Sequence, residues 1–116
     1  MTKDFYCDRV LPGNVEVTKI FESDNILAFH HTNPFWEVHI VIIPKMHIDS
    51  FTTIPKNQLS VLAELIQTAS HLCAQIEASH GGCRLSTNCG NYQSNKHLHF
   101  YIHAGAPLRK EDGSLI

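Results

Sequence analysis

Histidines occupy alternate positions of the segment at residues 97–103, with one tyrosine in the series. Residues two apart on a β-strand lie on the same face of the sheet. The segment therefore predicts a strand whose polar rings project together, with about 7 Å between neighbours; these rings are His97, His99, Tyr101 and His103. The apolar residues between them would anchor the strand in the core.

A row of imidazoles is suited to chemistry at phosphorus. The unperturbed pKa of histidine is about 6.5, so a neutral ring can attack an electrophile at pH 7 while its neighbours donate hydrogen bonds to developing charge. Two other interpretations remain open. The histidines could face water on a surface strand, or they could bind zinc together with a ligand from another segment.

Strands and one long helix are expected around this segment. Apolar residues at spacings of three and four predict an amphipathic helix over 55–80, with Thr53 as its N-cap and Gly81-Gly82 at its end. Alternating or continuous apolar runs predict strands at 15–20, 26–29, 38–43, 83–87 and 97–103. Strands around one long helix indicate an α+β domain.

Composition excludes several classes of protein. The nine Lys and Arg residues are scattered and the net charge is -2, so we expect no binding to long nucleic acid. The apolar run Ile40 to Ile43 is far shorter than the ~20 residues of a membrane helix, so no membrane association is expected. With no apolar signal region at residues 1–9, the four cysteines are interpreted as free thiols in the cytoplasm.

Three motifs make the chain resemble the histidine-triad (HIT) hydrolases and transferases, and most closely their Hint-type branch. They are Q-S-N-K-H-L-H-F-Y-I at 93–102, L-A-F-H-H-T-N-P at 27–34 and V-H-I-V-I-I-P-K-M-H at 38–47. The resemblance extends from about Val17 to Gly105. It implies a single HIT-like domain over 1–116, with an antiparallel sheet of about five strands, one long helix and a short N-terminal helix or turn.

The resemblance also implies catalytic roles. His99, the middle position of the triad, would be the nucleophile that accepts a nucleoside monophosphate, and His97 would orient the phosphate. Ser94 would assist the leaving group, and His39 would support the catalytic rings. Tyr101 stands where the family usually has the third histidine, and a phenol can donate a hydrogen bond but cannot carry positive charge.

Nucleotide-binding positions follow from the same resemblance. Asn88 matches the loop asparagine that contacts phosphate or ribose, and Phe29 and His30 would border the nucleoside pocket. Gln93, the first residue of the triad motif, joins this set. His31 replaces the aspartate that usually binds the ribose hydroxyls, which alters sugar recognition. His103, one strand step beyond the triad, is a candidate substitute for the missing ring.

Some bacterial relatives carry a zinc-binding C-x-x-C motif near the N-terminus and a histidine after the P-K motif. Here Cys7 and His47 are present, but the partner position is Asp4. Because this ligand set is incomplete, we predict no tight structural zinc, no metal-ligand residues and no required cofactor.

The function expected from the resemblance is cleavage of a nucleoside phosphoramidate, acyl nucleotide or dinucleotide through a covalent nucleotidyl-histidine intermediate. The partner would be a purine nucleoside monophosphate or its conjugate. One alternative is a catalytically weak nucleotide-binding or sensing protein, and another is a metal-binding protein that uses the histidine row. A homodimer is also expected, with the long helix or an edge strand at its interface.

Overall fold

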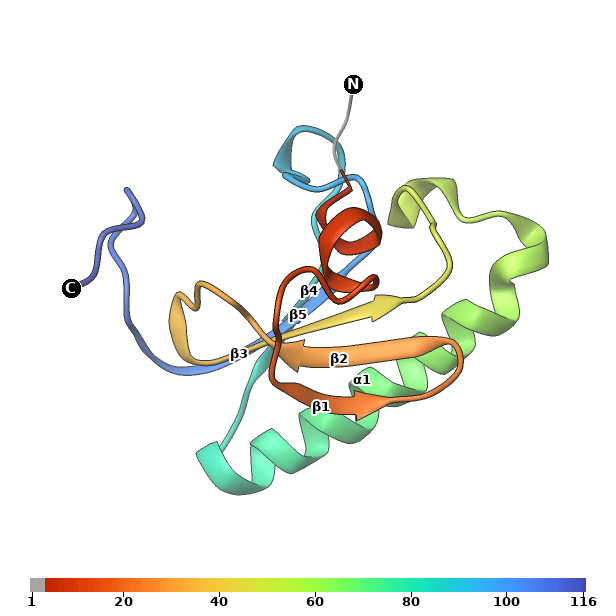
Figure 1. Cartoon of the computed structure of the whole chain (residues 1–116). Coiled ribbons are helices and arrows are strands. Elements are labelled where there is room, and N and C mark those ends of the chain that lie inside the picture. The colour runs from red at the N-terminus through yellow and green to blue at the C-terminus, as the bar shows by residue number, and fades with distance from the viewer. Residues whose placement is uncertain (1–3) are drawn as a thin grey trace.

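A five-stranded antiparallel sheet forms the centre of the molecule, in a computed structural model that describes residues 4–116. The strand order is β1-β2-β3-β5-β4 (Figure 1). The strands are β1 (Lys19–Glu22), β2 (Ile26–His30), β3 (Trp36–Pro44), β4 (Arg84–Ser86) and β5 (Phe100–Pro107). The predicted α+β fold, with one long helix and a short N-terminal helical turn, is therefore confirmed.

Helix α1 (Leu59–His80) covers one face of the sheet. Its apolar stripe packs Leu65, Ala69 and Leu72 against even-numbered residues of the central strands, among them Ile40 and Ile42. The helix ends at Gly81, whose φ of 83° is the left-handed conformation predicted for its C-cap. The predicted start was wrong: a short 3-10 turn precedes Leu59, and Thr53 belongs to an earlier turn.

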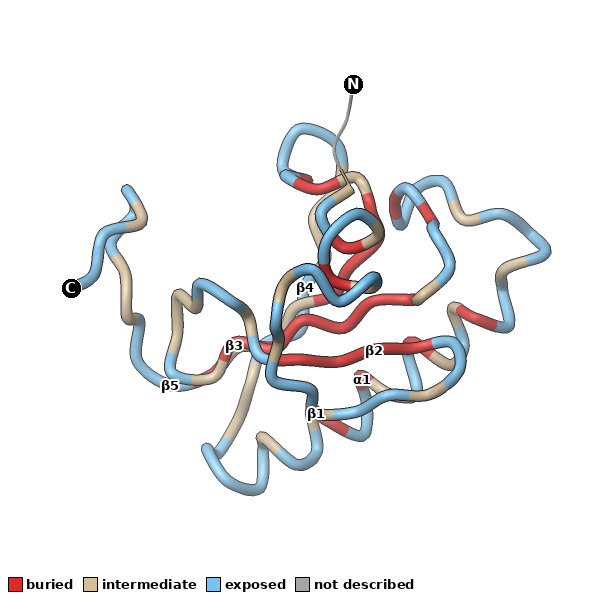
Figure 2. The backbone as a smooth tube through the Cα atoms, in the orientation of Figure 1, coloured by how far each residue is buried: buried red, intermediate tan, exposed pale blue. Residues whose placement is uncertain are grey.

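The N-terminal segment covers the opposite face. A short helical turn, Tyr6–Val10, lies over strands β2 and β3 and buries Tyr6 and Val10 against odd-numbered residues of these strands. Those residues are Leu27, Phe29, Val41 and Ile43. The central strands β2 and β3 are buried along much of their length as a result, whereas the edge strand β1 is mostly exposed (Figure 2).

Two strands begin later in the structure than predicted, and the later start of β5 affects the site. Strand β5 begins at Phe100, so the first two histidines of the row, His97 and His99, lie in the preceding loop rather than in the strand. His97 still lies on the same side as His99, since both rings contact Tyr6 at 5.8 and 5.2 Å, but its ring nitrogens are held by a separate cluster. Strand β1 begins at Lys19, four residues after its predicted start.

The described cysteines at positions 7, 73, 83 and 89 are free thiols, as expected. Within residues 4–116 there is no helix of sufficient length and apolar character to cross a membrane.

A glycine bulge joins the ends of strands β3 and β5. The pairs Trp36–Pro107 and Val38–Ala104 leave one extra residue on β5, and Gly105 accommodates it with a φ of 83°. A Cβ atom at this position would lie 2.9 Å from the Cβ of Glu37. Glu37 also accepts a hydrogen bond from the Ala106 amide at 3.1 Å.

We predict that Gly105→Ala destabilises the protein by about 2–4 kcal/mol, because left-handed strain and a steric clash add together. Gly81→Ala is the matched control, since it has the same φ but nothing within 4 Å; it should cost about 1–2 kcal/mol. Denaturant unfolding of both variants measures the difference. Equal losses would show that the contact with Glu37 does not constrain the bulge.

Candidate functional site

His99 has the geometry of a buried nucleophile. Its side chain is 1% exposed, and its Nδ1–H donates to the carbonyl of His97 at 2.7 Å. A neutral imidazole carries one proton, so Nε2 holds a lone pair. Among residues 4–116, Nε2 has no hydrogen-bond partner. Burial lowers the pKa of His99, which keeps the ring neutral and nucleophilic at pH 7.

A cavity of about 280 Å³ lies beyond two rings that contact His99, and His99 itself is not among its lining residues. The rings of Tyr6 and Tyr101 form part of its wall, and their centroids lie 5.2 and 4.9 Å from that of His99. His99 therefore lies directly beneath two tyrosines of the cavity wall. The full lining is Phe5, Tyr6, Phe29, His31, Thr32, Val41, Ser94, Asn95 and Tyr101.

The two tyrosines interact with each other. Burial raises the pKa of Tyr101, and a hydrogen bond with Tyr6 partly offsets that rise. Burial also raises the pKa of Tyr6, and the nearby Tyr101 raises it further. Both phenols are therefore protonated at pH 7 and present O–H donors beside His99.

His39 and His31 support Tyr101 from the side of strand β3. Their rings stack at 4.2 Å, and His39 also contacts Tyr101 edge-on at 5.1 Å. The Phe35 amide donates to His39 Nδ1 at 3.0 Å, so the neutral ring carries its proton on Nε2. His39 thus positions Tyr101, whereas the resemblance gave it a supporting role for the catalytic rings in general.

Four of the predicted site residues line the cavity: Phe29, His31, Ser94 and Tyr101. Other predicted positions lie elsewhere. His30 is exposed, Asn88 is outside the cavity lining, and the side chain of Gln93 donates to the Asp49 carbonyl at 2.7 Å. His103 stacks on Trp36 at 3.9 Å and lines a different cavity, so it does not occupy the place of the missing triad ring.

Sequence reasoning missed five cavity residues, which are Phe5, Tyr6, Thr32, Val41 and Asn95. Asn95 lies inside the triad motif, beside Ser94, and that adjacency was an available signal. Nothing in the local pattern at Phe5 and Tyr6 indicates that the N-terminal segment folds back over the sheet.

A second cluster brings Asp4, Cys7, His47 and His97 together, with one ligand atom from each inside a 4.8 Å span. The Cys7 Sγ lies 3.2 Å from His97 Nδ1 and 3.7 Å from His47 Nδ1. Asp4 Oδ2 lies 2.9 Å from His97 Nδ1 and also contacts His47 Nδ1. His97 joins this cluster, although the triad motif predicted only that it orients the phosphate.

The outer nitrogens of both histidines fit a metal centre. His97 Nε2–H donates to the Pro44 carbonyl at 2.7 Å, and His47 Nε2 contacts the carboxylate of Asp49. Each ring thus directs Nδ1 into the cluster while a second contact orients it, as is usual for metal-bound histidine. A thiolate, two imidazoles and a carboxylate form a donor set suitable for tetrahedral zinc, and such an ion would supply rigidity to the N-terminal segment.

Protonation in the cluster is perturbed. Burial raises the pKa of Asp4, but hydrogen bonds from Cys7 and His97 bring it down to about 2. Burial and the adjacent Asp4 raise the pKa of the Cys7 thiol to about 12. His97 is 0% exposed, and Asp4 and the Pro44 carbonyl hold its two ring nitrogens.

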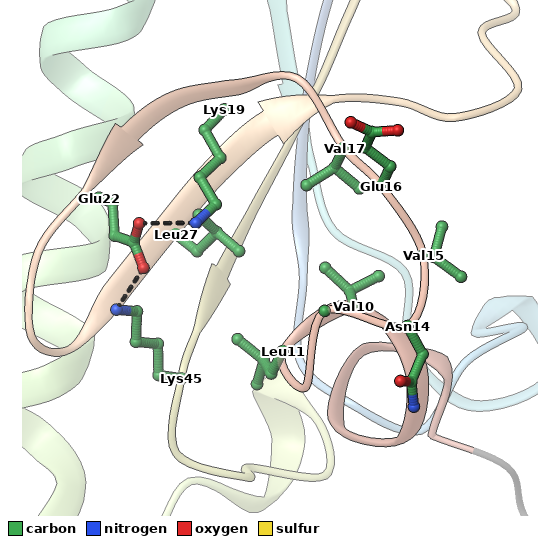
Figure 3. A pocket seen from close by; sticks show the side chains of 11 residues that line it. Val10, Leu11, Asn14, Val15, Glu16, Val17, Lys19, Glu22, Leu27 and Lys45 are labelled. Atoms are coloured by element: carbon green, nitrogen blue, oxygen red, sulfur yellow. Dashed lines mark hydrogen bonds and ion pairs between the residues drawn. The ribbon is translucent and has the colours of Figure 1, made fainter.

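A larger cavity of about 670 Å³ lies between the N-terminal segment and strand β2 (Figure 3). Glu22 joins Lys19 and Lys45 at its rim through ion pairs of 3.0 and 2.7 Å. Its lining includes no histidine, cysteine or serine that could act as a nucleophile. The smaller cavity beside His99 is therefore the candidate active site.

We predict that His39 makes the protein less stable in acid. Burial lowers its pKa to about 4, below the unfolded value of about 6.5, so the unfolded state binds more protons below pH 6.5. Stability should fall by at most about 3 kcal/mol from this group as the pH drops from 6.5 to 4. His39→Asn keeps an acceptor for the Phe35 amide but cannot titrate. Its unfolding free energy should therefore fall less steeply between pH 6.5 and 4 than that of the wild-type protein. Equal slopes in the two proteins would contradict the assignment.

Known proteins resemble this chain over most of its length. The family model described as HIT domain matches residues 13–107. An uncharacterised HIT-like protein of Azospirillum brasilense is 31% identical over 105 residues, which are 86% of this chain and 84% of that protein. Adenylylsulfatase HINT1 of Arabidopsis thaliana is 32% identical over 111 residues, which are 91% of this chain and 74% of that protein.

A solved histidine triad protein from Clostridium difficile superposes with a TM-score of 0.77 at 31% identity, covering 95% of this chain and 98% of that one. The sequence motifs, the five-stranded sheet and these matches agree over most of the length. The chain belongs to the histidine-triad (HIT) family.

Proposed function

We propose that this protein is a nucleotide hydrolase or transferase that forms a covalent nucleotidyl intermediate on His99. One observation carries the proposal: Nε2 of His99 is buried with its lone pair free of any partner among residues 4–116, beneath two tyrosines that line a cavity. Burying a polar atom without a partner costs free energy and needs an explanation. The explanation that we propose is that the lone pair is kept free to form a bond to phosphorus.

The reaction follows from the positions of the side chains. Nε2 attacks the phosphorus of a nucleoside phosphoramidate, acyl nucleotide or dinucleotide, and the bond to the leaving group breaks as the P–N bond forms. The Tyr101 hydroxyl donates a hydrogen bond to the phosphoryl oxygens, and Ser94 donates its hydroxyl proton to the leaving group while taking one from solvent water. Water then cleaves the P–N bond and releases the nucleoside monophosphate, so these steps require no cofactor.

The cavity lining supports a purine nucleoside as the bound group. Phe5, Tyr6 and Phe29 give aromatic surface against which a base can pack. The resemblance to a relative named adenylylsulfatase supports an adenylyl substrate. His31 presents an imidazole where a carboxylate would accept ribose hydroxyls, so we propose weaker selection for the sugar than that carboxylate gives.

A second candidate function is nucleotide binding or sensing with little turnover. The burial of His99 beneath Tyr6 and the phenol at position 101 favour it, because the ring must become accessible and the third imidazole is absent. Calorimetry that detects AMP or GMP binding, combined with no hydrolysis of a substrate panel, would support sensing over catalysis. The expected homodimer, testable by light scattering, and the cytoplasmic location stay predictions.

We predict that His99→Asn lowers turnover of an adenosine phosphoramidate by about 10⁴-fold or more, because the nucleophile is lost. The asparagine amide can still donate to the His97 carbonyl, so the fold and AMP affinity should change little. Single-turnover kinetics measures the effect. His71→Ala, on the exposed side of helix α1, is the control; unchanged turnover in His99→Asn would reject the mechanism.

Tyr101→His should accelerate phosphoramidate cleavage by about 10²-fold, because an imidazolium can protonate an amine leaving group. Cleavage of an acyl nucleotide should change much less, since its carboxylate leaving group needs no proton. The ratio of kcat values for the two substrates measures the effect. An equal change for both would show that position 101 does not influence leaving-group protonation.

A further inference from the structure

The metal-fitting cluster and the cavity share one short piece of chain. Asp4 and Cys7 belong to the cluster, and the two residues between them, Phe5 and Tyr6, line the cavity. A group that binds Asp4 and Cys7 therefore holds both ends of the segment that forms one cavity wall.

Contacts on the cavity side of this segment are specific. The Phe5 amide donates to Asn95 Oδ1 at 3.0 Å, and Asn95 itself lines the cavity. The Tyr6 ring packs edge-on against Phe29 at 6.0 Å and His99 at 5.2 Å. Displacement of the segment would remove the aromatic wall and expose the nucleophile.

His97 forms a second connection between the two sites. Its Nδ1 lies in the cluster, and its backbone carbonyl accepts the hydrogen bond from His99 Nδ1. The ring is also held by the Pro44 carbonyl and is 0% exposed, so it has little freedom to move independently of its backbone. An ion on His97 thus constrains the peptide group that orients His99.

The structure assigns to this cluster a regulatory role: an exchangeable zinc ion on Asp4, Cys7, His47 and His97 strengthens nucleotide binding by fixing Phe5 and Tyr6 as the cavity wall. Asp4 supplies a harder oxygen ligand than a thiolate, which favours exchange over permanent retention of zinc. This inference rests on the proposed nucleotide binding. Coupling between two sites is reciprocal, so AMP must strengthen zinc binding by the same factor.

The test is a pair of calorimetric titrations of the full chain. AMP is titrated into chelator-treated protein and into protein that holds one equivalent of Zn²⁺, and Zn²⁺ is titrated with and without AMP. We expect about a 10-fold tighter Kd for AMP with zinc, and the same factor in the reciprocal experiment. One-to-one zinc binding with an unchanged AMP Kd would overturn the coupling while the proposed function stands.

Variants at position 4 provide matched controls. Asp4→Asn retains Oδ1 as an acceptor for the Cys7 amide, a contact of 2.9 Å, but removes the anionic ligand. Its Kd for AMP should equal that of the zinc-free wild-type protein, whether or not zinc is added. Asp4→Cys should keep zinc in the presence of a chelator that strips the wild-type protein. Equal retention by both proteins would refute the role given to the carboxylate.

Hydrogen exchange separates the two proposals. Zinc alone, without nucleotide, should slow exchange of the backbone amides of Phe5, Tyr6 and Cys7 in the wild-type protein but not in Asp4→Asn. Unaltered exchange on zinc addition would contradict the ordering of the wall. Failure of AMP to bind either form would reject the proposed function, and the coupling with it, even where zinc orders the segment.

Discussion

The backbone carbonyl of His97 determines which nitrogen of His99 can react. A carbonyl can only accept a hydrogen bond, so Nδ1 of His99 must carry the proton, and the lone pair is placed on Nε2. Burial keeps the ring uncharged. The remaining features of the proposed site depend on this hydrogen bond. The two tyrosines and Ser94, which line the cavity, can assist a reaction only if the adjacent ring presents a nitrogen that can attack.

Holding that carbonyl in place requires elements far apart in the sequence. His97 is tied to Pro44 at the end of strand β3 and to Asp4 and Cys7 in the N-terminal segment. The first strand residue, Phe100, follows His99 directly and is anchored in the core beneath. The loop that carries His99 is thus fixed on one side by the sheet and on the other by the polar cluster.

Much of the fold could be predicted from local patterns. The stripe on helix α1, the left-handed Gly81 and the apolar runs of strands β2 and β3 are signals carried by neighbouring residues. The placement of His97 could not be predicted in this way. Strict alternation predicted one face for the rings, and His97 and His99 do both contact Tyr6. The distant partners that hold the ring of His97, Asp4 and the Pro44 carbonyl, give no local signal. The cavity wall at Phe5 and Tyr6 likewise depends on long-range packing.

The central claim is that Nε2 of His99 forms a bond to phosphorus. The most direct measurement is mass spectrometry of the intact and proteolysed protein, quenched within the first turnover after mixing with an adenosine phosphoramidate. The account predicts one adenylyl group per active chain, located on the peptide that contains His99 and absent from the His99→Asn variant. Turnover with no adduct at any quench time, or an adduct on a residue other than His99, would contradict it.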